Sequence, residues 1–271
     1  MSIIAVIRNF YYKLAGGYAV VAVLSWLFFG YVDYVLNIIT PDSFSFDFEA
    51  IAVVNFIILV SIISLALAIF REKKWALVIA GVIGLVFIAL FGITYINWIG
   101  VGIVALLFLY ARQSGVEEID QRTKINAKNI VRRTVPAVIT AFFVLISFAA
   151  FQSPVARGIA EAEQLPLASQ QLMRSIIDSV IGGQIETGPE KENIINQVSN
   201  ETIKQFNNIL KPYFQYAPPL LAFGLFLILW GLSWIFVWLS VFAGMVIFWI
   251  LKKINFIRTE ERDVRAEVLI I

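Results

Sequence analysis

The feature that most constrains this chain is a series of apolar stretches, each long enough to cross a lipid bilayer. An α-helix rises 1.5 Å per residue, so about 20 apolar residues span the roughly 30 Å hydrocarbon core. The stretches lie at 17–39, 51–70, 75–111, 135–151 and 217–251. The whole chain is accordingly 60% hydrophobic and only 15% charged. The sequence therefore predicts an all-α fold, a polytopic transmembrane helical bundle.

The stretch 75–111 is too long for a single crossing. Its middle, residues 94–98, reads Thr-Tyr-Ile-Asn-Trp and combines polar and aromatic residues of the kind found at the membrane–water interface. We therefore expect a tight hairpin there, with one span on each side of it. This division gives six spans in total.

The basic residues indicate the orientation, because cytoplasmic loops of membrane proteins are enriched in Lys and Arg. With six spans and a cytoplasmic N-terminus, sixteen of the 21 Lys and Arg residues fall on the inner side. A single crossing over 75–111 would instead move the basic segment 112–134 to the outside. We expect a multi-pass protein of the plasma membrane, with both termini cytoplasmic and residues 152–216 extracytoplasmic.

The last apolar stretch, 217–251, allows two interpretations. One helix of this length would measure roughly 52 Å, so it would tilt or extend beyond the bilayer. Two short helices would fit the bilayer better, but they would place the basic tail 252–271 on the outer side. We therefore expect one long transmembrane helix.

Three segments on the inner side have predicted structures or roles of their own. Residues 1–16 carry apolar residues at helical spacing opposite basic ones, which predicts an amphipathic helix on the inner membrane surface. A second surface helix is expected in the inner loop 112–134, where acidic residues among the basic ones argue against nucleic-acid binding. The tail 252–271 ends in apolar residues and is a candidate binding segment for a protein partner.

The polar region 152–216 is the only part outside the spans that is large enough to have its own fold. Two helices are expected in it, one over 167–181 that ends before Gly182-Gly183 and one that begins at Pro189. The second helix carries an apolar stripe: Ile194, Ile195, Val198, Ile203, Phe206, Ile209 and Leu210. Either a hairpin of the two helices buries this stripe, or the stripe docks onto a neighbouring subunit or partner.

The chain contains no Cys and no His, which excludes thiol chemistry, imidazole catalysis, haem and the usual zinc and iron–sulfur sites. We expect no catalytic residue, no cofactor and no metal site, so the protein is predicted not to be an enzyme. Asp33 is the only ionisable side chain inside a predicted span, and with Asn37 it is a candidate ion or proton site. Its place in the outer third of the helix, beside Tyr31 and Tyr34, favours contact with headgroup water instead.

Two sets of residues carry information about helix packing. The first is a ridge of small residues in the third span: Ala76, Ala80 and Gly84. The second is an aromatic row in the last stretch, with two glycines: Gly224, Phe226, Trp230, Gly231, Trp234, Trp238 and Phe242. Trp234 falls near the middle of the predicted helix, although Trp usually lies at the membrane interface. Packing within the chain and lipid contact explain the second set, and a subunit interface or a hydrophobic pore is the alternative.

The leading hypothesis is a non-enzymatic, homo-oligomeric membrane scaffold whose outer helical domain, 152–216, acts in assembly or in binding a protein partner. The alternative is a homo-oligomeric channel with a hydrophobic pore at the subunit symmetry axis. The expected partners are the lipid bilayer, further copies of the chain and a protein partner, but no nucleic acid.

Overall fold

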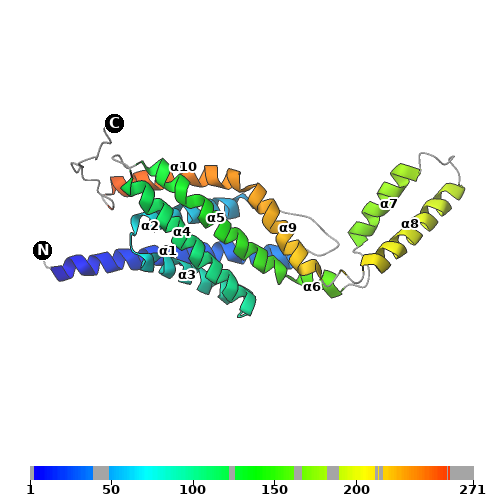
Figure 1. Cartoon of the computed structure of the whole chain (residues 1–271), viewed down its shortest axis with the longest axis horizontal. Helices are drawn as coiled ribbons and strands as arrows, with labels where there is room; N and C mark the ends of the chain where they lie inside the picture. The colour runs from blue at the N-terminus through cyan, green and yellow to red at the C-terminus, as the bar shows by residue number, and fades with distance from the viewer. Residues whose placement is uncertain are drawn as a thin grey trace, which may run out of the picture. The chain divides into compact units, whose positions relative to one another are not determined.

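The structure of the chain is a computed structural model, and in the part that it describes the secondary structure is helical (Figure 1). The described residues are 3–38, 49–121, 126–161, 167–181, 189–210, 213, 216–254 and 256. For 3–15, 167–169, 178, 180–181, 189–195 and 210 the backbone alone is described. The helices are α1 (Ile3–Ile38), α2 (Ala50–Ile69), α3 (Lys73–Phe91), α4 (Tyr95–Asp120), α5 (Ala127–Phe151), α6 (Pro154–Glu161), α7 (Leu167–Ile181), α8 (Pro189–Leu210), α9 (Ala217–Gly231) and α10 (Ser233–Lys253). For these residues the predicted all-α fold is confirmed.

Six of the described helices are long and apolar enough to cross a membrane, as the sequence predicts. These candidate spans are Gly16–Ile38, Ala50–Ile69, Lys73–Phe91, Tyr95–Asp120, Ala127–Phe151 and Ser233–Lys253. The shortest has 19 residues and so measures about 28 Å, close to the thickness of the hydrocarbon core. The helices fit a multi-pass membrane protein.

The predicted hairpin at 94–98 is confirmed, because one helix ends before it and the next begins inside it. Helix α3 ends at Phe91, and Gly92 follows with a φ of 87°, which favours glycine. The Thr94 hydroxyl oxygen caps α4 by accepting a hydrogen bond from the Asn97 backbone N–H at 3.4 Å. The buried Asn97 amide donates to the carbonyl oxygens of Gly92 at 2.8 Å and Phe91 at 3.3 Å. These bonds satisfy carbonyl groups at the end of α3.

The prediction of one long helix over 217–251 is wrong, because the stretch consists of α9 and α10, separated at Leu232. Gly231 and Ser233 flank the break, and Gly and Ser together are a common cause of sharp bends in helices. Helix α10, with 21 residues, is a candidate span on its own, whereas α9 has 15 residues and is shorter than a span.

The two surface helices predicted on the inner side are not separate elements. Helix α1 runs through Gly16 and Gly17 without a break, so the described part of 1–16 continues into the first span. Residues 113–120 extend α4, and residues 127–134 begin α5. Since Gly115 and Thr134 are buried in this region, the described part of 112–134 consists of packed helix ends.

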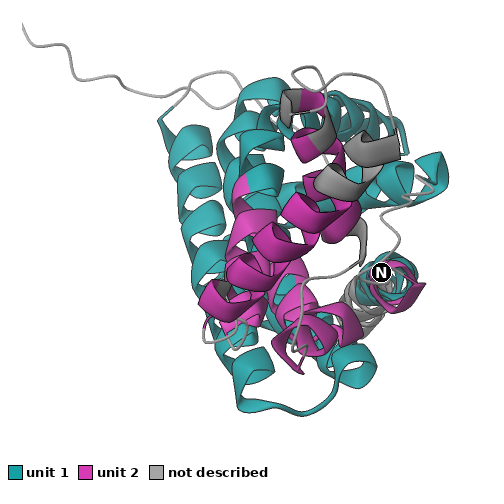
Figure 2. Ribbon diagram, turned by 90° about the vertical axis from the view of Figure 1, so that its right-hand side faces the viewer, with its two compact units in different colours: residues 1–31, 49–145, 228–271 teal, residues 32–48, 146–227 magenta. Residues whose placement is uncertain are grey.

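The chain divides into two compact units, which Figure 2 colours separately. Unit 1 comprises Met1–Tyr31, Glu49–Leu145 and Ile228–Ile271, and it contains α2, α3, α4 and α10 with most of α1 and α5. Unit 2 comprises Val32–Phe48 and Ile146–Leu227, and it contains α6, α7 and α8. In unit 1, α2 packs against α3, α4 and α10, and α3 packs against α4. In unit 2, α7 packs against α8.

Phenylalanine rings form the centre of unit 1. The ring centroid of Phe142 in α5 lies 5.7 Å from those of Phe28 and Phe29 in α1. It also lies 5.6 Å from Phe56 in α2. The cluster continues from Phe29 to Phe87 in α3 and from Phe56 to Phe236 in α10. One aromatic cluster therefore joins five helices.

Glycines allow close contacts of α5 with two other helices of unit 1. A Cβ atom added at Gly115 in α4 would lie 2.7 Å from Cγ2 of Thr134 in α5 and 3.0 Å from Cβ of Ala68 in α2. One added at Gly244 in α10 would lie 2.9 Å from Cγ1 of Val131 in α5. Small residues let helix backbones approach closely in membrane proteins, so both glycines are packing positions.

Candidate functional site

Asp33 and Asn37 lie together on α1, as their spacing predicts. The Asn37 amide donates hydrogen bonds to Oδ1 of Asp33 at 3.1 Å and to the Asp33 backbone carbonyl oxygen at 2.9 Å. Asn37 is exposed and Asp33 is half-buried, close to the end of the helix at Ile38. Both bonds are internal to α1, so the two side chains form a polar pair close to the end of this helix. An ion or proton site at this pair stays a prediction.

The ridge of small residues on α3 lies inside unit 1. Ala76, Ala80 and Gly84 are all buried. At Gly84, an added Cβ would lie 2.5 Å from Cγ1 and 2.9 Å from Cγ2 of Val101 in α4. Gly84 therefore packs α3 against α4 of the same chain.

We expect Gly84→Ala to destabilise the protein, because the new methyl group would overlap Val101. Overpacking outweighs the better helix propensity of Ala, which gives a net loss of about 1 kcal/mol in the free energy of unfolding. Unfolding of the full chain in mixed detergent micelles, followed by circular dichroism, measures this loss.

The control is Gly81→Ala on the same helix, where an added Cβ meets nothing within 4 Å. Replacing Val101 by Ala in the Gly84→Ala background should restore much of the lost stability, because it removes the overlapping methyl groups. Equal losses for the Gly81 and Gly84 variants would contradict the close contact.

The predicted aromatic row is not continuous, because the break at Leu232 separates its members. Helix α9 carries Gly224, Phe226, Trp230 and Gly231, and α10 carries Trp234, Trp238 and Phe242. Trp234 is the second residue of α10, so its expected position near the middle of a long helix is wrong. A place at the end of a span is the usual one for Trp, since its ring suits the interface.

Helix α10 has one packed face and one exposed face. On the packed face, Ser240 is buried and its carbonyl oxygen accepts a hydrogen bond from Oγ of Ser61 in α2 at 2.9 Å. On the exposed face, Trp234, Trp238 and Phe242 are 64–77% exposed. That face is open to lipid or to a second copy of the chain.

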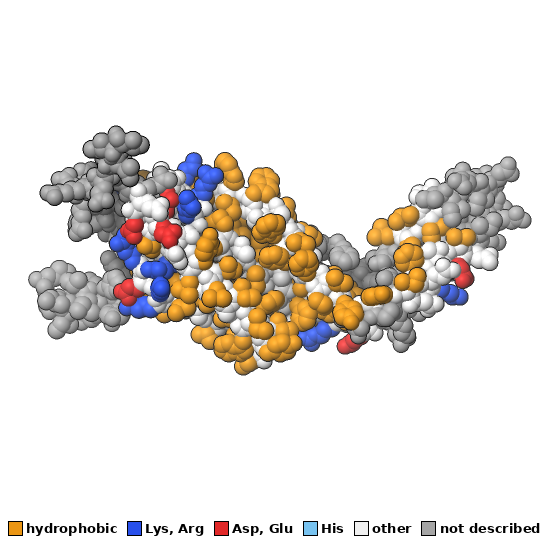
Figure 3. Space-filling model, in the orientation of Figure 1, with side chains coloured by type: hydrophobic (Ala, Val, Ile, Leu, Met, Phe, Trp, Pro, Cys, Tyr) orange, Lys and Arg blue, Asp and Glu red, His pale blue; other side chains and the backbone are white. Residues whose placement is uncertain are grey.

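Apart from Glu49 before α2, the described charged side chains of unit 1 gather where α2, α4 and α10 end and α3 and α5 begin. Figure 3 shows basic and acidic side chains at that end and hydrophobic side chains over the adjoining surface. The described members of this charged end are Arg71, Glu72, Lys73, Lys74, Arg112, Glu117, Glu118, Asp120, Lys128, Arg132, Arg133, Lys252 and Lys253. Among these residues, nine are basic and four acidic, so the charged end has a formal surplus of five positive charges.

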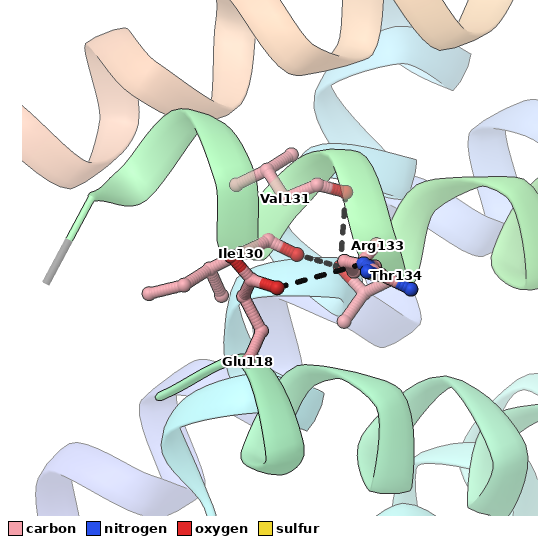
Figure 4. A network of polar contacts seen from close by, with 5 residues as sticks. All are labelled: Glu118, Ile130, Val131, Arg133 and Thr134. Carbon is pink, nitrogen blue, oxygen red and sulfur yellow. Dashed lines mark hydrogen bonds and ion pairs between the residues drawn. The ribbon is translucent and has the colours of Figure 1, made fainter. Parts of the chain in front are cut away.

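Glu118 is the buried acid of the charged end. Its side chain, from α4, is 5% exposed and lies 3.5 Å from Nε of Arg133 in α5, measured from Oε2 (Figure 4). The neighbouring Thr134 hydroxyl donates to the carbonyl oxygens of Ile130 and Val131 within its own helix, each at 3.2 Å. A buried carboxylate requires a partner, and Arg133, which is 68% exposed, supplies the opposite charge from the surface.

The other acids of the charged end also have polar partners. Asp120 forms an ion pair with Arg71, which joins the end of α4 to the segment between α2 and α3. Glu72 pairs with Lys74. Oε1 of Glu117 accepts a hydrogen bond from Nε2 of Gln113 at 2.9 Å. Three of the four acids are thus neutralised by nearby bases.

The burial of Glu118 was not predicted from the sequence. The segment 112–134 was expected to lie on the membrane surface, where an acid among bases has no special position. The spacing of the neighbouring small residues does indicate that Glu118 shares a helix side with them. Gly115 is three residues before Glu118, and Ala111 is four residues before Gly115. The three share one side of α4 and all are buried.

The helices α7 and α8 of unit 2 match the predicted boundaries, since α7 is Leu167–Ile181 and α8 begins at Pro189. They pack against each other, and Arg174 of α7 donates to Oδ1 of Asn200 in α8 at 3.0 Å. Ser199 and Ile203 of α8 are buried.

Hydrophobic side chains nevertheless stay exposed on both helices of this pair, as Figure 3 shows. The large ones are Leu172 and Ile176 on α7 with Phe206 and Ile209 on α8, and each is at least 45% exposed. Their spacings of four and three residues place each pair on one side of its helix. We call these four residues the hairpin patch. The hairpin therefore buries only part of the predicted stripe, in which the side chains of Ile194, Ile195 and Leu210 lie outside the described residues.

Within the described part of the chain, no group of three or more acidic side chains is placed to hold a metal ion. The candidate partner-binding segment of the tail, from residue 257 to the end, lies outside the described residues. Comparison with models of known protein families, with curated proteins and with solved structures finds no match in any of the three.

Proposed function

We propose that the protein is a non-enzymatic membrane scaffold that assembles into a homo-oligomer through the α7–α8 hairpin. The observation that carries the proposal is the hairpin patch, in which four large apolar side chains are exposed on a helix pair outside the candidate spans. Two helices alone bury little apolar surface, whereas two such hairpins packed together form a four-helix bundle with a core. A second copy of the chain supplies the same patch, as a symmetric interface requires.

The distribution of charges supports the proposed orientation. The charged end of unit 1 has nine described basic residues, and cytoplasmic segments next to spans are enriched in Lys and Arg. We therefore propose that this end faces the cytoplasm of a plasma membrane, together with both termini. Residues 152–216, which include the hairpin, are then extracytoplasmic.

We expect the double variant Leu172→Glu with Phe206→Glu to weaken self-association of the full chain. A carboxylate placed in an apolar interface is desolvated without a partner, so the dissociation constant should rise about tenfold or more. Native mass spectrometry in a mild detergent, over a range of protein concentrations, measures the populations of monomer and oligomer.

The charge-matched control is Gln171→Glu with Gln205→Glu, because these exposed residues are the sequence neighbours of the two patch positions. This control should assemble like the unaltered chain. A monomeric unaltered chain, or equal weakening by both double variants, would refute assembly through the hairpin patch.

The alternative of a homo-oligomeric channel rests on a different observation, the exposed face of α10 with Trp234, Trp238 and Phe242. A second copy packed on this face would bring rows of large apolar side chains together, as in a hydrophobic constriction. Recording from planar bilayers distinguishes the two functions, because a scaffold gives no unitary currents.

A further inference from the structure

We propose that the charged end of unit 1 is a binding surface for anionic lipid headgroups. The inference is separate from hairpin assembly, because it concerns other helices and another kind of partner. Its first support is the surplus of positive charge that the described residues carry there. Each Lys or Arg at a membrane surface contributes a favourable free energy of attraction to anionic lipid, and the contributions of clustered residues add together.

The ion pairs between described residues involve only three of the nine described bases at the charged end. Arg71, Lys74 and Arg133 are paired with acids. Among the described residues, no acidic side chain lies within ion-pair distance of six others: Lys73, Arg112, Lys128, Arg132, Lys252 and Lys253. They come from α3, α4, α5 and α10, so the surplus is spread around one end of the bundle.

Two Lys–Trp contacts place this charge at the height of the lipid headgroups. Nζ of Lys74 lies 5.2 Å from the ring centroid of Trp75, and Nζ of Lys253 lies 5.1 Å from that of Trp249. Tryptophan rings favour the interface between hydrocarbon and headgroups, and a cation over the ring is stabilised by it. The amino groups on the two rings therefore lie close to the phosphate layer.

The surface next to these bases is apolar, which selects a lipid over a soluble anion. Leu77 and Val78 follow the lysines of α3 by about one turn and are exposed. Val246 and Ile250 precede the lysines of α10 and are also exposed. An anionic lipid contacts the bases with its headgroup and this apolar surface with its acyl chains, whereas a soluble anion makes only the first contact.

The test compares phosphatidylglycerol with phosphatidylcholine bound to the purified full-length chain in a neutral detergent. Native mass spectrometry counts the retained lipids and gives their relative affinities. We expect phosphatidylglycerol to be retained preferentially, and the preference to fall when the ionic strength is raised, because salt screens exposed charges. Equal retention of the two lipids would overturn the proposal.

The variant Arg132→Gln with Lys253→Gln removes two exposed bases of the charged end that form no ion pair with a described acid. We expect its affinity for phosphatidylglycerol to fall about tenfold to thirtyfold. This estimate adds the free energy of attraction that two basic residues typically contribute and converts it to a ratio of affinities. The control Arg157→Gln with Lys204→Gln removes the same charge from exposed residues of unit 2. Equal losses in the two variants would overturn the assignment to the charged end. Displacement of the lipid by glycerol phosphate at about the same concentration would overturn the assignment to lipid.

Discussion

Gly115→Leu is expected to destabilise the bundle by about 3 kcal/mol, at the upper end of the cost of overpacking. The Cβ atom of the new side chain alone would lie 2.7 Å from Cγ2 of Thr134 and 3.2 Å from Cα of Ala68. Thr134 is held by two hydrogen bonds to its own helix, and Ala68 presents backbone, so neither can move aside easily. A leucine must therefore separate α4 from α2 and α5. Unfolding of the full chain by sodium dodecyl sulfate in mixed micelles, followed by circular dichroism, measures the loss.

The matched control for this variant is Gly102→Leu, on the same helix. A Cβ at Gly102 meets nothing within 4 Å, and Leu has the higher helix propensity. The control should therefore be as stable as the unaltered chain or slightly more stable. If the two leucine variants lose equal stability, the three-helix contact at Gly115 is not as close as described.

Phe142→Ala is the second substitution with a large expected effect. It removes a buried ring that contacts the rings of Phe28, Phe29 and Phe56, and it leaves a cavity between α1, α2 and α5. In soluble proteins such a change costs about 3–5 kcal/mol, part of which is transfer of the ring to water. A ring released from a membrane bundle contacts lipid instead of water. We therefore expect only the part of the destabilisation that comes from lost packing, roughly 2–3 kcal/mol.

The same unfolding measurement applies, with Phe242→Ala as the control. Phe242 is 66% exposed on α10, so its removal should change the free energy of unfolding by much less. A loss for Phe242→Ala as large as that for Phe142→Ala would contradict the central position of the aromatic cluster. It would instead indicate a contact that the exposed face of α10 makes with a second copy.

The number of candidate spans could be predicted from the sequence because apolar length is a local property. The same holds for the turn between α3 and α4, where Gly92 and Thr94 act through their own backbone and hydroxyl groups. The end of α7 follows from the glycines that come after it, and the start of α8 follows from Pro189. Each of these signals lies within a few residues of the element that it determines.

The candidate sites were less accessible to sequence reasoning, because they depend on contacts between distant segments. The buried state of Glu118 results from the packing of α4 against other helices, which periodicity within one helix does not identify. The phenylalanine cluster joins residues from Phe28 to Phe236, and each of them alone resembles any other apolar residue in a span. The break at Leu232 has only a weak local signal, a single Gly and a single Ser, and charge distribution favoured the opposite conclusion.

The break at Leu232 affects whether the chain would cross a membrane an odd or an even number of times. Helix α9 has 15 residues, which reach about 22 Å, and this falls short of the roughly 30 Å hydrocarbon core. Helix α10 reaches about 31 Å by itself, so it needs no contribution from α9 to cross. A crossing by α9 would make the number of crossings odd and put the two ends of the chain on opposite sides. The six candidate spans without α9 would make six crossings, and an even number of crossings would place both ends of the chain on the same side whichever way the protein is inserted.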